Sequence, residues 1–265
     1  MNILFTVCGR AGSKGFKSKN LQELLGYPLA WYPLAAIDLL EKEHGDTFHV
    51  CASSDSEELL SLICQGTTVP VFPIRRSAQL SGDATAKVLV TVDCLRQSDQ
   101  HFGVAHDLVV DLDITSPLRT VADIEHAIQK KKSLPETDVV FSVVPSRRSP
   151  YFNMVVRQGD SENYQIVCPS GYTARQQAPQ VYDMNASIYV YEREYLLRDE
   201  LFNRTNSIIE MKDTAVLDID SKEDFLMMEV IARYLLSKDE EFSKVYQNIS
   251  QIKRRRAMKC VSPPE

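Results

Sequence analysis

Apolar residues fall along this chain in two alternating patterns, short continuous runs and segments with helical spacing. The continuous runs predict strands, and the segments with a repeat near 3.6 residues predict helices. Through the first half, strands are predicted at residues 3–8, 47–52, 70–73, 108–112 and 139–144, and helices at 28–41, 57–64, 83–97 and 121–131. Strands that alternate with helices favour a mostly parallel sheet covered on both faces, so we expect a three-layer α/β/α, Rossmann-like fold.

Residues 146–180 interrupt this alternation. Prolines, glycines and arginines separate two short extended runs there, at 152–156 and 164–168. This composition predicts a β-hairpin arm that leaves the sheet. Because a lone two-stranded hairpin cannot build its own core, we expect the arm to pack on something, and a second subunit is the candidate.

The alternation resumes after the arm. Strands are predicted at residues 185–191, 207–211 and 216–219, and Ser221 with Asp224 forms a capping-box pattern before a helix at 222–236. We therefore expect one domain over residues 1–236 with the arm inserted into it. Residues 237–265 are expected to be peripheral, and we interpret their basic cluster at 253–256 as a solvated terminus rather than a nucleic-acid site.

Composition narrows the functions that this fold could carry. Hydrophobic residues make up 44% of the chain and charged residues 25%, as in ordinary globular proteins. A net charge of −6 argues against a general nucleic-acid binder, and no apolar run approaches the ~20 residues that span a bilayer. The six cysteines are far apart without a C-x-x-C pair, so we expect reduced thiols in a cytoplasmic protein with no membrane or nucleic-acid partner.

The first predicted strand runs into a cationic, glycine-rich loop. Glycines at positions 9, 12 and 15 stand among Arg10, Lys14, Lys17 and Lys19, and Asn20 ends the loop. Glycines let backbone N–H groups approach an anion without Cβ clashes, and the cations supply charge, so a polyphosphate is the natural ligand. The alternative is a surface loop whose basic residues are accidental.

The spacing of these glycines excludes two common phosphate-binding motifs. A Walker loop requires G-x-x-x-x-G-K-[ST], but Phe16 follows Gly15. A Rossmann fingerprint requires G-x-G-x-x-G, whereas these glycines are separated by three positions throughout. The remaining interpretation is a loop that folds over a triphosphate, because phosphoryl transfer depends mainly on positioning and charge neutralisation.

Two carboxylates follow a short apolar run near the end of the predicted domain, in Asp218-Ile219-Asp220. If residues 216–219 form a strand, alternate side chains face the same way and both carboxylates can bind one hard cation, for which Mg²⁺ is the candidate. The alternative is a solvated strand end in which Asp220 helps to cap the following helix. Together with the cationic loop, the pair suggests a nucleotide–metal site.

Two further segments carry polar residues suited to a second substrate. The sequence DITSPLR, from Asp113 to Arg119, leaves the carboxyl end of a predicted strand, where open α/β sheets bind ligands; the alternative is a structural ion pair between these two residues. Arg175, Gln176 and Gln177 follow the arm. Arginine can grip a carboxylate with two hydrogen bonds and amides can bind hydroxyl or acetamido groups, as an acidic sugar would require; otherwise this is a polar loop at the hairpin base.

Six motifs stand in one order along the chain: RAGSK at 10–14 with Lys19-Asn20, Arg76 followed by Leu80 and Asp83, TSPLR at 115–119, RQQ at 175–177, NASIY at 185–189 and DID at 218–220. Each motif alone is modest evidence, but six in order are strong. Over roughly residues 3–236, the chain resembles the CMP-nonulosonic acid synthetases, or acylneuraminate cytidylyltransferases.

The resemblance implies a nucleotidyltransferase fold and a CTP-dependent reaction. The anomeric hydroxyl of a nine-carbon α-keto acid would attack the α-phosphorus of CTP, releasing pyrophosphate and giving a CMP-sugar. The family is typically dimeric, with an arm that crosses to the partner. We therefore expect a homodimer, with a tetramer as the alternative.

The resemblance also assigns residues to three roles. The nucleotide-binding residues would be Arg10, Gly12, Ser13, Lys14, Lys19, Asn20, Arg76 and Thr85. The sugar-binding residues would be Asp113, Ser116, Arg119, Arg175, Gln176 and Asn185. The catalytic residues would be Lys19, Asp218 and Asp220, of which the two aspartates would bind Mg²⁺.

Two departures from the neuraminic type bear on the sugar. Asp113-Ile114 stands where that type usually has glutamine-proline, and Cys8-Gly9 replaces its proline-alanine. These details resemble more closely the branch that activates legionaminic acid or a related diacetamido sugar. The sequence leaves open the shorter acid Kdo, another nucleotide, and a catalytically silent nucleotide-binding subunit.

Overall fold

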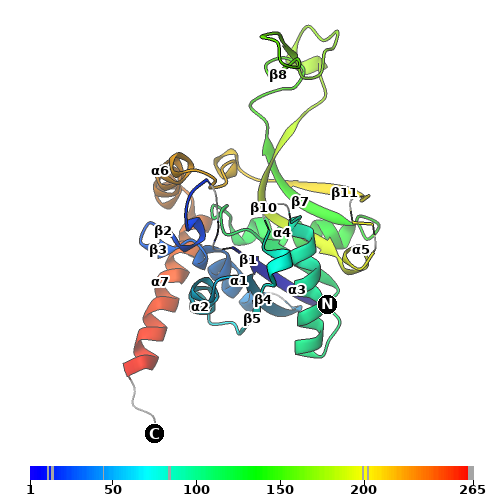
Figure 1. Ribbon diagram of the computed structural model, residues 1–265. Coiled ribbons are helices and arrows are strands. Elements are labelled where there is room, and N and C mark those ends of the chain that lie inside the picture. The colour runs from blue at the N-terminus through cyan, green and yellow to red at the C-terminus, as the bar shows by residue number, and fades with distance from the viewer. Residues whose placement is uncertain are drawn as a thin grey trace.

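The centre of the computed structural model is a seven-stranded sheet in the order β11-β7-β10-β6-β1-β4-β5 (Figure 1). The structure describes residues 1–10, 12, 15–43, 45–82, 85–198, 200–201 and 203–261, with only the backbone of residues 43 and 256–261. The strands are β1 (Asn2–Cys8), β4 (Thr47–Ser54), β5 (Val71–Arg75), β6 (Leu108–Leu112), β7 (Val139–Pro145), β10 (Tyr182–Glu192) and β11 (Asn206–Glu210). Only β10 runs antiparallel to its neighbours, so the mostly parallel sheet is confirmed.

Helices cover both faces of this sheet. They are α1 (Trp31–Glu43), α2 (Glu57–Cys64), α3 (Lys87–Phe102), α4 (Val121–Ser133), α5 (Arg193–Leu196), α6 (Lys222–Lys238) and α7 (Glu240–Val261). In β1, Ile3 and Phe5 join the core formed with α1, α4 and α7, whereas Leu4 joins the core formed with α3 and α5. Successive side chains of one strand thus fill two cores, which confirms the three-layer arrangement. Within the described residues, every helix is too short or too polar to span a bilayer.

The helix starts carry the capping residues that the sequence indicates. Ser56 accepts a hydrogen bond from the Leu59 N–H at the start of α2, whose bounds match the prediction. Ser221 and Asp224 form the predicted capping box at the start of α6. Such caps satisfy N–H groups that have no partner inside the helix, so they fix where each helix begins. The start of α6 is therefore set directly after Asp220.

Residues 216–219 do not form the predicted strand. They follow a short 3₁₀ helix, η4 (Asp213–Ala215), and continue as irregular chain to the start of α6. Ile219 is buried, and its N–H donates to the carbonyl of Thr115 at 2.9 Å. The apolar pattern is satisfied by packing against the 113–119 loop, because periodicity alone does not show whether a strand edge is available for pairing.

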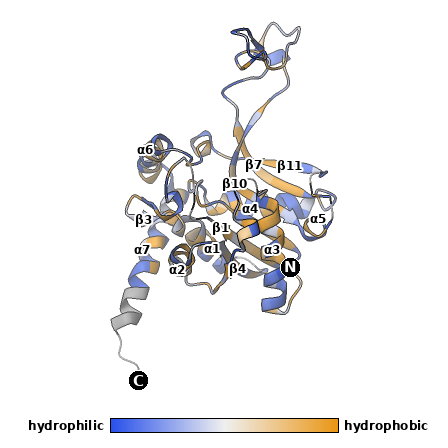
Figure 2. Ribbon diagram, viewed as in Figure 1, coloured by the Kyte–Doolittle hydropathy of each residue, from blue (hydrophilic) through white to orange (hydrophobic). Residues whose placement is uncertain are grey.

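The predicted arm is present as an extension of β7 and β10 away from the body of the molecule (Figure 1). It carries a hairpin of β8 (Val155–Arg157) and β9 (Tyr164–Ile166), which pair antiparallel. Figure 2 colours the strands of the body mostly hydrophobic, whereas the arm tip mixes hydrophobic and hydrophilic residues. Val155 is 61% exposed and Tyr164 52%, so this hairpin holds apolar side chains at the surface.

The chain after Ser237 is not peripheral, contrary to the prediction. Helix α7 packs along α1 and α6, and its residues Phe242, Val245, Ile249 and Ile252 are buried in the main core. These positions have the spacing of one helix face, so the helix buries an apolar stripe although a basic cluster follows near its end. The helix is further held by Asn248, whose Nδ2 donates to the Ala35 carbonyl at 3.0 Å.

Candidate active site

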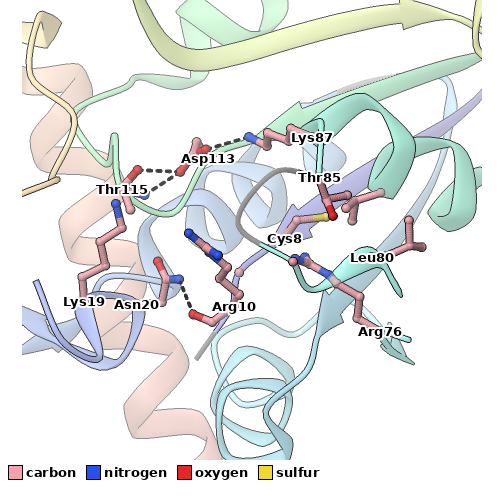
Figure 3. Close-up of a pocket in the computed structure, with 13 residues that line it drawn as sticks. Cys8, Arg10, Lys19, Asn20, Arg76, Leu80, Thr85, Lys87, Asp113 and Thr115 are labelled. Atoms are coloured by element: carbon pink, nitrogen blue, oxygen red, sulfur yellow. Dashed lines mark hydrogen bonds and ion pairs between the residues drawn. The ribbon is translucent and has the colours of Figure 1, made fainter. Parts of the chain in front are cut away.

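A cavity of about 210 Å³ lies beyond the carboxyl ends of β1 and β6 (Figure 3). Parallel strands end on the same edge of a sheet, so the loops that follow them meet there. The cavity is lined by Cys8, Gly9, Arg10, Lys19, Asn20, Arg76, Leu80, Gly82, Thr85, Lys87, Val90, Asp113 and Thr115. Three arginine or lysine residues assigned to the nucleotide from the sequence, Arg10, Lys19 and Arg76, therefore surround one space.

The segment after β1 is held close to the sheet. A Cβ atom on Gly9 would lie 2.7 Å from the end of the Leu59 side chain, so the backbone at Gly9 packs closely against α2. Asn20 is 6% exposed, and its Nδ2 donates to the Arg10 carbonyl at 3.0 Å. Asn20 thus fixes the backbone that carries Arg10 at the cavity.

Not every predicted residue of this loop can be placed. Ser13 and Lys14 lie outside the described residues. Gly12 is described but does not line the cavity, and nothing lies within 4 Å of where its Cβ would be. The structure therefore describes this loop mainly at its two ends, residues 9–10 and 15–20.

Lys19 joins this loop to the Asp218–Asp220 segment, two hundred residues away. Its Nζ donates to the Ile219 carbonyl and to Asp220 Oδ1, each at 2.7 Å. A Cβ atom on Gly15 would lie 2.5 Å from the Asp220 carbonyl oxygen, so the two backbones are in direct contact. The fold brings together the cationic loop and the paired carboxylates, although the predicted strand that was to present them is absent.

Asp218 and Asp220 sit in different surroundings. Asp218 is partly buried, whereas the Asp220 side chain is 73% exposed. Burial raises the pKa of the Asp218 carboxyl, and the negative charges of Asp220 and Asp113 raise it further. Several carboxylates therefore share a region where a cation would relieve their repulsion.

Arg76 and Thr85 lie on the opposite wall of the cavity from Lys19 (Figure 3). Arg76 is 9% exposed, and its guanidinium donates to Ser53 Oγ at 3.2 Å and to the Ser53 carbonyl at 2.9 Å. Thr85 Oγ1 donates to the Gln79 carbonyl at 3.3 Å. The structure brings Arg76 and Thr85 to the same cavity as Arg10 and Lys19, and the resemblance assigns all four to the nucleotide.

Asp113 forms an ion pair, but with Lys87 rather than with Arg119. Lys87 Nζ lies 2.6 Å from Asp113 Oδ2 and 2.6 Å from Asp111 Oδ2. Asp113 Oδ1 accepts hydrogen bonds from the Thr115 N–H at 2.8 Å and Oγ1 at 2.7 Å. Burial opposes its ionisation, but Lys87 and Thr115 outweigh burial and hold the pKa of Asp113 well below its usual value.

Sequence reasoning missed Lys87. It is the first residue of α3, where a cation meets the positive end of the helix dipole. Because the helix was predicted over residues 83–97, the sequence pattern carried no sign that Lys87 stands at a helix start beside carboxylates.

Ser116, Arg119 and Asn185, which the resemblance assigns to the sugar, are almost fully buried in the described structure. Arg119 is fully buried; its Nε donates to Ser187 Oγ at 3.0 Å, its Nη2 donates to the carbonyls of Asp113 and Ser116, and burial lowers its pKa to about 10. Asn185 is 1% exposed and bonds to Ser142 Oγ and the Ala215 carbonyl. Ser116 is 2% exposed. Their burial makes them supports for the loop that carries Asp113 and Thr115.

Arg175 and Gln176 lie apart from the cavity, in the 3₁₀ helix η3 (Arg175–Gln177) at the base of the arm. Both side chains are exposed. Arg175 Nη2 donates to the Arg147 carbonyl at 3.3 Å, and Arg147 in turn pairs with Asp213 of η4. This part of the predicted sugar site is linked to the chain that leads to Asp218 but does not line the cavity.

The chain matches a family model described as Cytidylyltransferase over residues 4–248. It is 36% identical over 233 residues to the CMP-N,N'-diacetyllegionaminic acid synthase of Campylobacter jejuni, covering 86% of this chain and 94% of that protein. It is 34% identical over 234 residues to the post-translational flagellin modification protein B of Campylobacter coli, covering 87% and 95%. An N-acylneuraminate cytidylyltransferase of Streptococcus agalactiae is 29% identical over 85% of this chain, which matches 52% of that longer protein.

A solved structure of similar fold is the CMP:2-keto-3-deoxy-manno-octonic acid synthetase complexed with CTP. Its TM-score is 0.60 at 14% identity, and the match covers 88% of this chain and 99% of that chain. At this identity, the likeness shows the fold alone.

Proposed function

Because the chain belongs to the cytidylyltransferase family, we propose that it transfers CMP from CTP to the anomeric hydroxyl of a nonulosonic acid, of the legionaminic or sialic acid type. The sugar oxygen forms a bond to the α-phosphorus while the bond to the leaving pyrophosphate breaks. The similarity to a CMP-N,N'-diacetyllegionaminic acid synthase supports a diacetamido sugar as the acceptor.

The observation that carries the proposal is the contact of Lys19 with Asp220 at the mouth of the cavity. It places a carboxylate pair next to a cationic loop, across a space that Arg10 and Arg76 also line. Lysine and arginine here can neutralise a triphosphate and the charge that builds on departing pyrophosphate. Asn20 fixes the backbone of Arg10 at that wall, so Arg10 is already positioned at the cavity before a nucleotide binds.

The same segment suits Mg²⁺. Among the described residues, no three His, Cys, Asp or Glu side chains form a metal cluster, so Asp218 and Asp220 would supply two ligands beside substrate oxygens and water, as is usual for this ion. When bound, Mg²⁺ supplies charge neutralisation at the phosphates. Lys19 now neutralises Asp220 and can turn toward a phosphate when a cation takes its place.

The sugar side is assigned to the exposed base of the arm. Arg175 makes a single hydrogen bond to a carbonyl in the described structure, which leaves guanidinium donors for the sugar carboxylate. Gln176 lies beside it. We assign Asp113 to the sugar as well, on the wall where the two substrates meet.

A homodimer is the assembly that we propose. The arm exposes apolar residues on both hairpin strands, among them Val155, Val156 and Tyr164. A two-stranded hairpin of this kind is stabilised by packing on a further surface, and a second copy supplies one. Cys8, Cys51, Cys94 and Cys168 are free thiols, which supports activity in the reducing cytoplasm.

The test is pyrophosphate release by purified protein with CTP, Mg²⁺ and a panel of sialic, legionaminic and pseudaminic acids and Kdo. Release with a nonulosonic acid, and none with CTP alone, is the expected result. CTP should raise the melting temperature more than ATP, GTP or UTP, because ligands that bind the folded state stabilise it. CTP binding with no release across the whole panel would overturn the transferase proposal in favour of a silent nucleotide-binding subunit.

A further inference from the structure

Lys87 lies in the wall between two cavities. The first is the nucleotide cavity, and the second, of about 280 Å³, is lined by Ala86, Lys87, Val88, Tyr189, Tyr191, Leu201 and Arg204. Lys87 lines both, and its Nζ lies 5.8 Å from the centre of the Tyr189 ring. Its ammonium forms ion pairs with Asp111 and Asp113, and Figure 3 shows it directed at Asp113.

Those carboxylates are fixed by the sheet. Asp111 and Asp113 are two residues apart at the end of β6, so their side chains leave the same face. Asp111 is fully buried, and its Oδ1 accepts a hydrogen bond from Thr6 Oγ1 at 2.6 Å, which leaves Oδ2 for Lys87. Asp111 therefore holds the Lys87 ammonium in place, and Lys87 in turn lies beside the Asp113 carboxylate.

The hydrogen-bonding capacity of this pair is not exhausted. An ammonium has three N–H donors, and Lys87 donates one of them to Asp113 Oδ2. Its charge also faces Asp111 Oδ2 at 2.6 Å, an oxygen that has no hydrogen-bond partner among the described residues. A carboxylate has about four acceptor sites. Thr115 takes two of those on Asp113 and Lys87 one, so one acceptor remains on Oδ2. The pair offers at least one donor beside one acceptor, which complements the C=O and N–H of a secondary amide.

We propose that Lys87 and Asp113 together form a recognition pair for one acetamido group of the acceptor sugar, with Lys87 donating to its carbonyl and Asp113 accepting from its N–H. This inference rests on the proposed function, because it names the part of the sugar that meets the wall between the cavities. Asp111 is the positioning residue that holds Lys87 in place. The Lys87 ammonium and the carboxylates keep one another charged, since the pKa of Lys87 is raised, with burial outweighed by Asp111 and Asp113.

The experiment combines a substitution in the protein with the removal of one acetamido group from the sugar. Wild type and Lys87→Met are compared with N,N'-diacetyllegionaminic acid and with two analogues, each carrying a hydroxyl in place of one acetamido group. Hydrogen bonds to charged groups are worth enough to predict that Lys87→Met lowers sugar kcat/KM ~10- to 100-fold for two of the three sugars. The analogue that lacks the contacted acetamido group should lose less than ~3-fold, because that bond is already absent.

CTP provides the internal reference, and its KM should change less than ~3-fold in Lys87→Met. Lys132→Met is the matched control, since it breaks a lysine–aspartate pair of similar burial with Asp46 on another part of the body, and it should leave all three sugars unaffected. An equal loss of kcat/KM on all three sugars, or a parallel rise in the KM for CTP, would contradict recognition of an acetamido group by Lys87 and Asp113.

Asp113→Asn covers the case in which Lys87→Met does not fold. It keeps the Lys87–Asp111 contact and is nearly isosteric, yet it removes the ionised acceptor, so the same selective loss on two sugars is expected. Lys87→Arg should restore part of the sugar kcat/KM, because it retains a cation beside both carboxylates. If wild type itself releases no pyrophosphate with any sugar, the proposed function fails, a result distinct from an active enzyme whose Lys87 variants lack selectivity.

Discussion

The nucleotide half and the sugar half of the candidate site are built in different ways. In the nucleotide half, Asn20, Lys19 and Arg76 are each held by hydrogen bonds to backbone within the body of the molecule. In the sugar half, Arg175 lies on an exposed arm base and makes one long hydrogen bond. The first half is organised before any ligand arrives.

This difference indicates a division of labour. Polyphosphate recognition is the same for every member of a nucleotidyltransferase family, so a rigid cationic wall serves it well. A sugar is recognised by particular groups, and residues on a protruding arm can vary without disturbing the sheet. In the described structure, the Arg175 side chain is exposed.

Asp220→Ala tests the rigid half most severely. We expect kcat to fall ~100- to 1000-fold while CTP binding weakens less, because charge neutralisation matters most in the transition state. Pyrophosphate release and calorimetric CTP titration measure the two effects. Glu223→Ala is the control, since it removes the same charge from an exposed position on α6. Equal losses in turnover and binding would contradict a transition-state role for Asp220.

Asp38→Ala tests how strongly α7 is held to α1 in the body of the molecule. Asp38 is fully buried and accepts hydrogen bonds from Thr68, Asn248 and Lys42, so its loss should cost ~2–3 kcal/mol in the free energy of unfolding. Urea titration measures this cost, with exposed Glu41→Gln as the control. A cost below ~0.5 kcal/mol would show that α7 is held without Asp38.

The same carboxylate sets a pH dependence. Burial alone would raise the pKa of Asp38, but the hydrogen bonds from Lys42, Thr68 and Asn248 together lower it below its usual value of 3.8. A lowered folded pKa means that the stabilisation is complete above about pH 4 and is lost as the pH falls through the folded value. Urea titrations of wild type and Asp38→Ala should differ fully near pH 7 and converge below about pH 4.

Arg175→Ala tests the open half. Loss of a charge-assisted hydrogen bond should raise the KM for the sugar ~10-fold and leave the KM for CTP unchanged. Steady-state kinetics with each substrate varied in turn separates the two. Arg96→Ala, an exposed arginine on α3, should change neither value. An unaltered KM for the sugar in Arg175→Ala would remove this residue from the carboxylate site.

Val155→Asp should have the smallest effect on the body. A surface change on the arm is expected to alter the free energy of unfolding by less than ~0.5 kcal/mol. The mass in solution, measured by light scattering, should nevertheless fall from that of two chains to one, because the charge would be buried in the arm interface. Val155→Ile, which keeps the apolar surface, should remain dimeric. A dimer that persists in Val155→Asp would contradict the arm contact.

Much of the fold could be predicted because local signals agreed with the tertiary structure. The apolar run at β6 and the serine before α2 gave bounds that match the structure. The strand expected at 216–219 was wrong because alternation records only which side chains are buried, and Ile219 is buried against a loop. The helical spacing in α7 was present in the sequence, but the same segment carries a basic cluster that is typical of a solvated terminus.

The candidate site was predicted less evenly. Composition located Arg10, Lys19 and Asp220, because these residues stand in segments rich in charge, whereas Arg76 was assigned only through the family resemblance. Lys87 could not be found in that way, since a lysine in a helical segment is common and its partners lie on a strand more than twenty residues later. The burial of Asn185 is likewise a property of the folded chain.

The contact between Lys19 and Asp220 has a consequence for how the protein acquires activity. The two residues are 201 positions apart, and contacts at such separation form only after the intervening chain has condensed. A nascent chain that has emerged as far as β10 would hold the sheet around the loop but not the segment that completes it. Competence to bind and activate a nucleotide should therefore appear late in folding, after the sheet is in place.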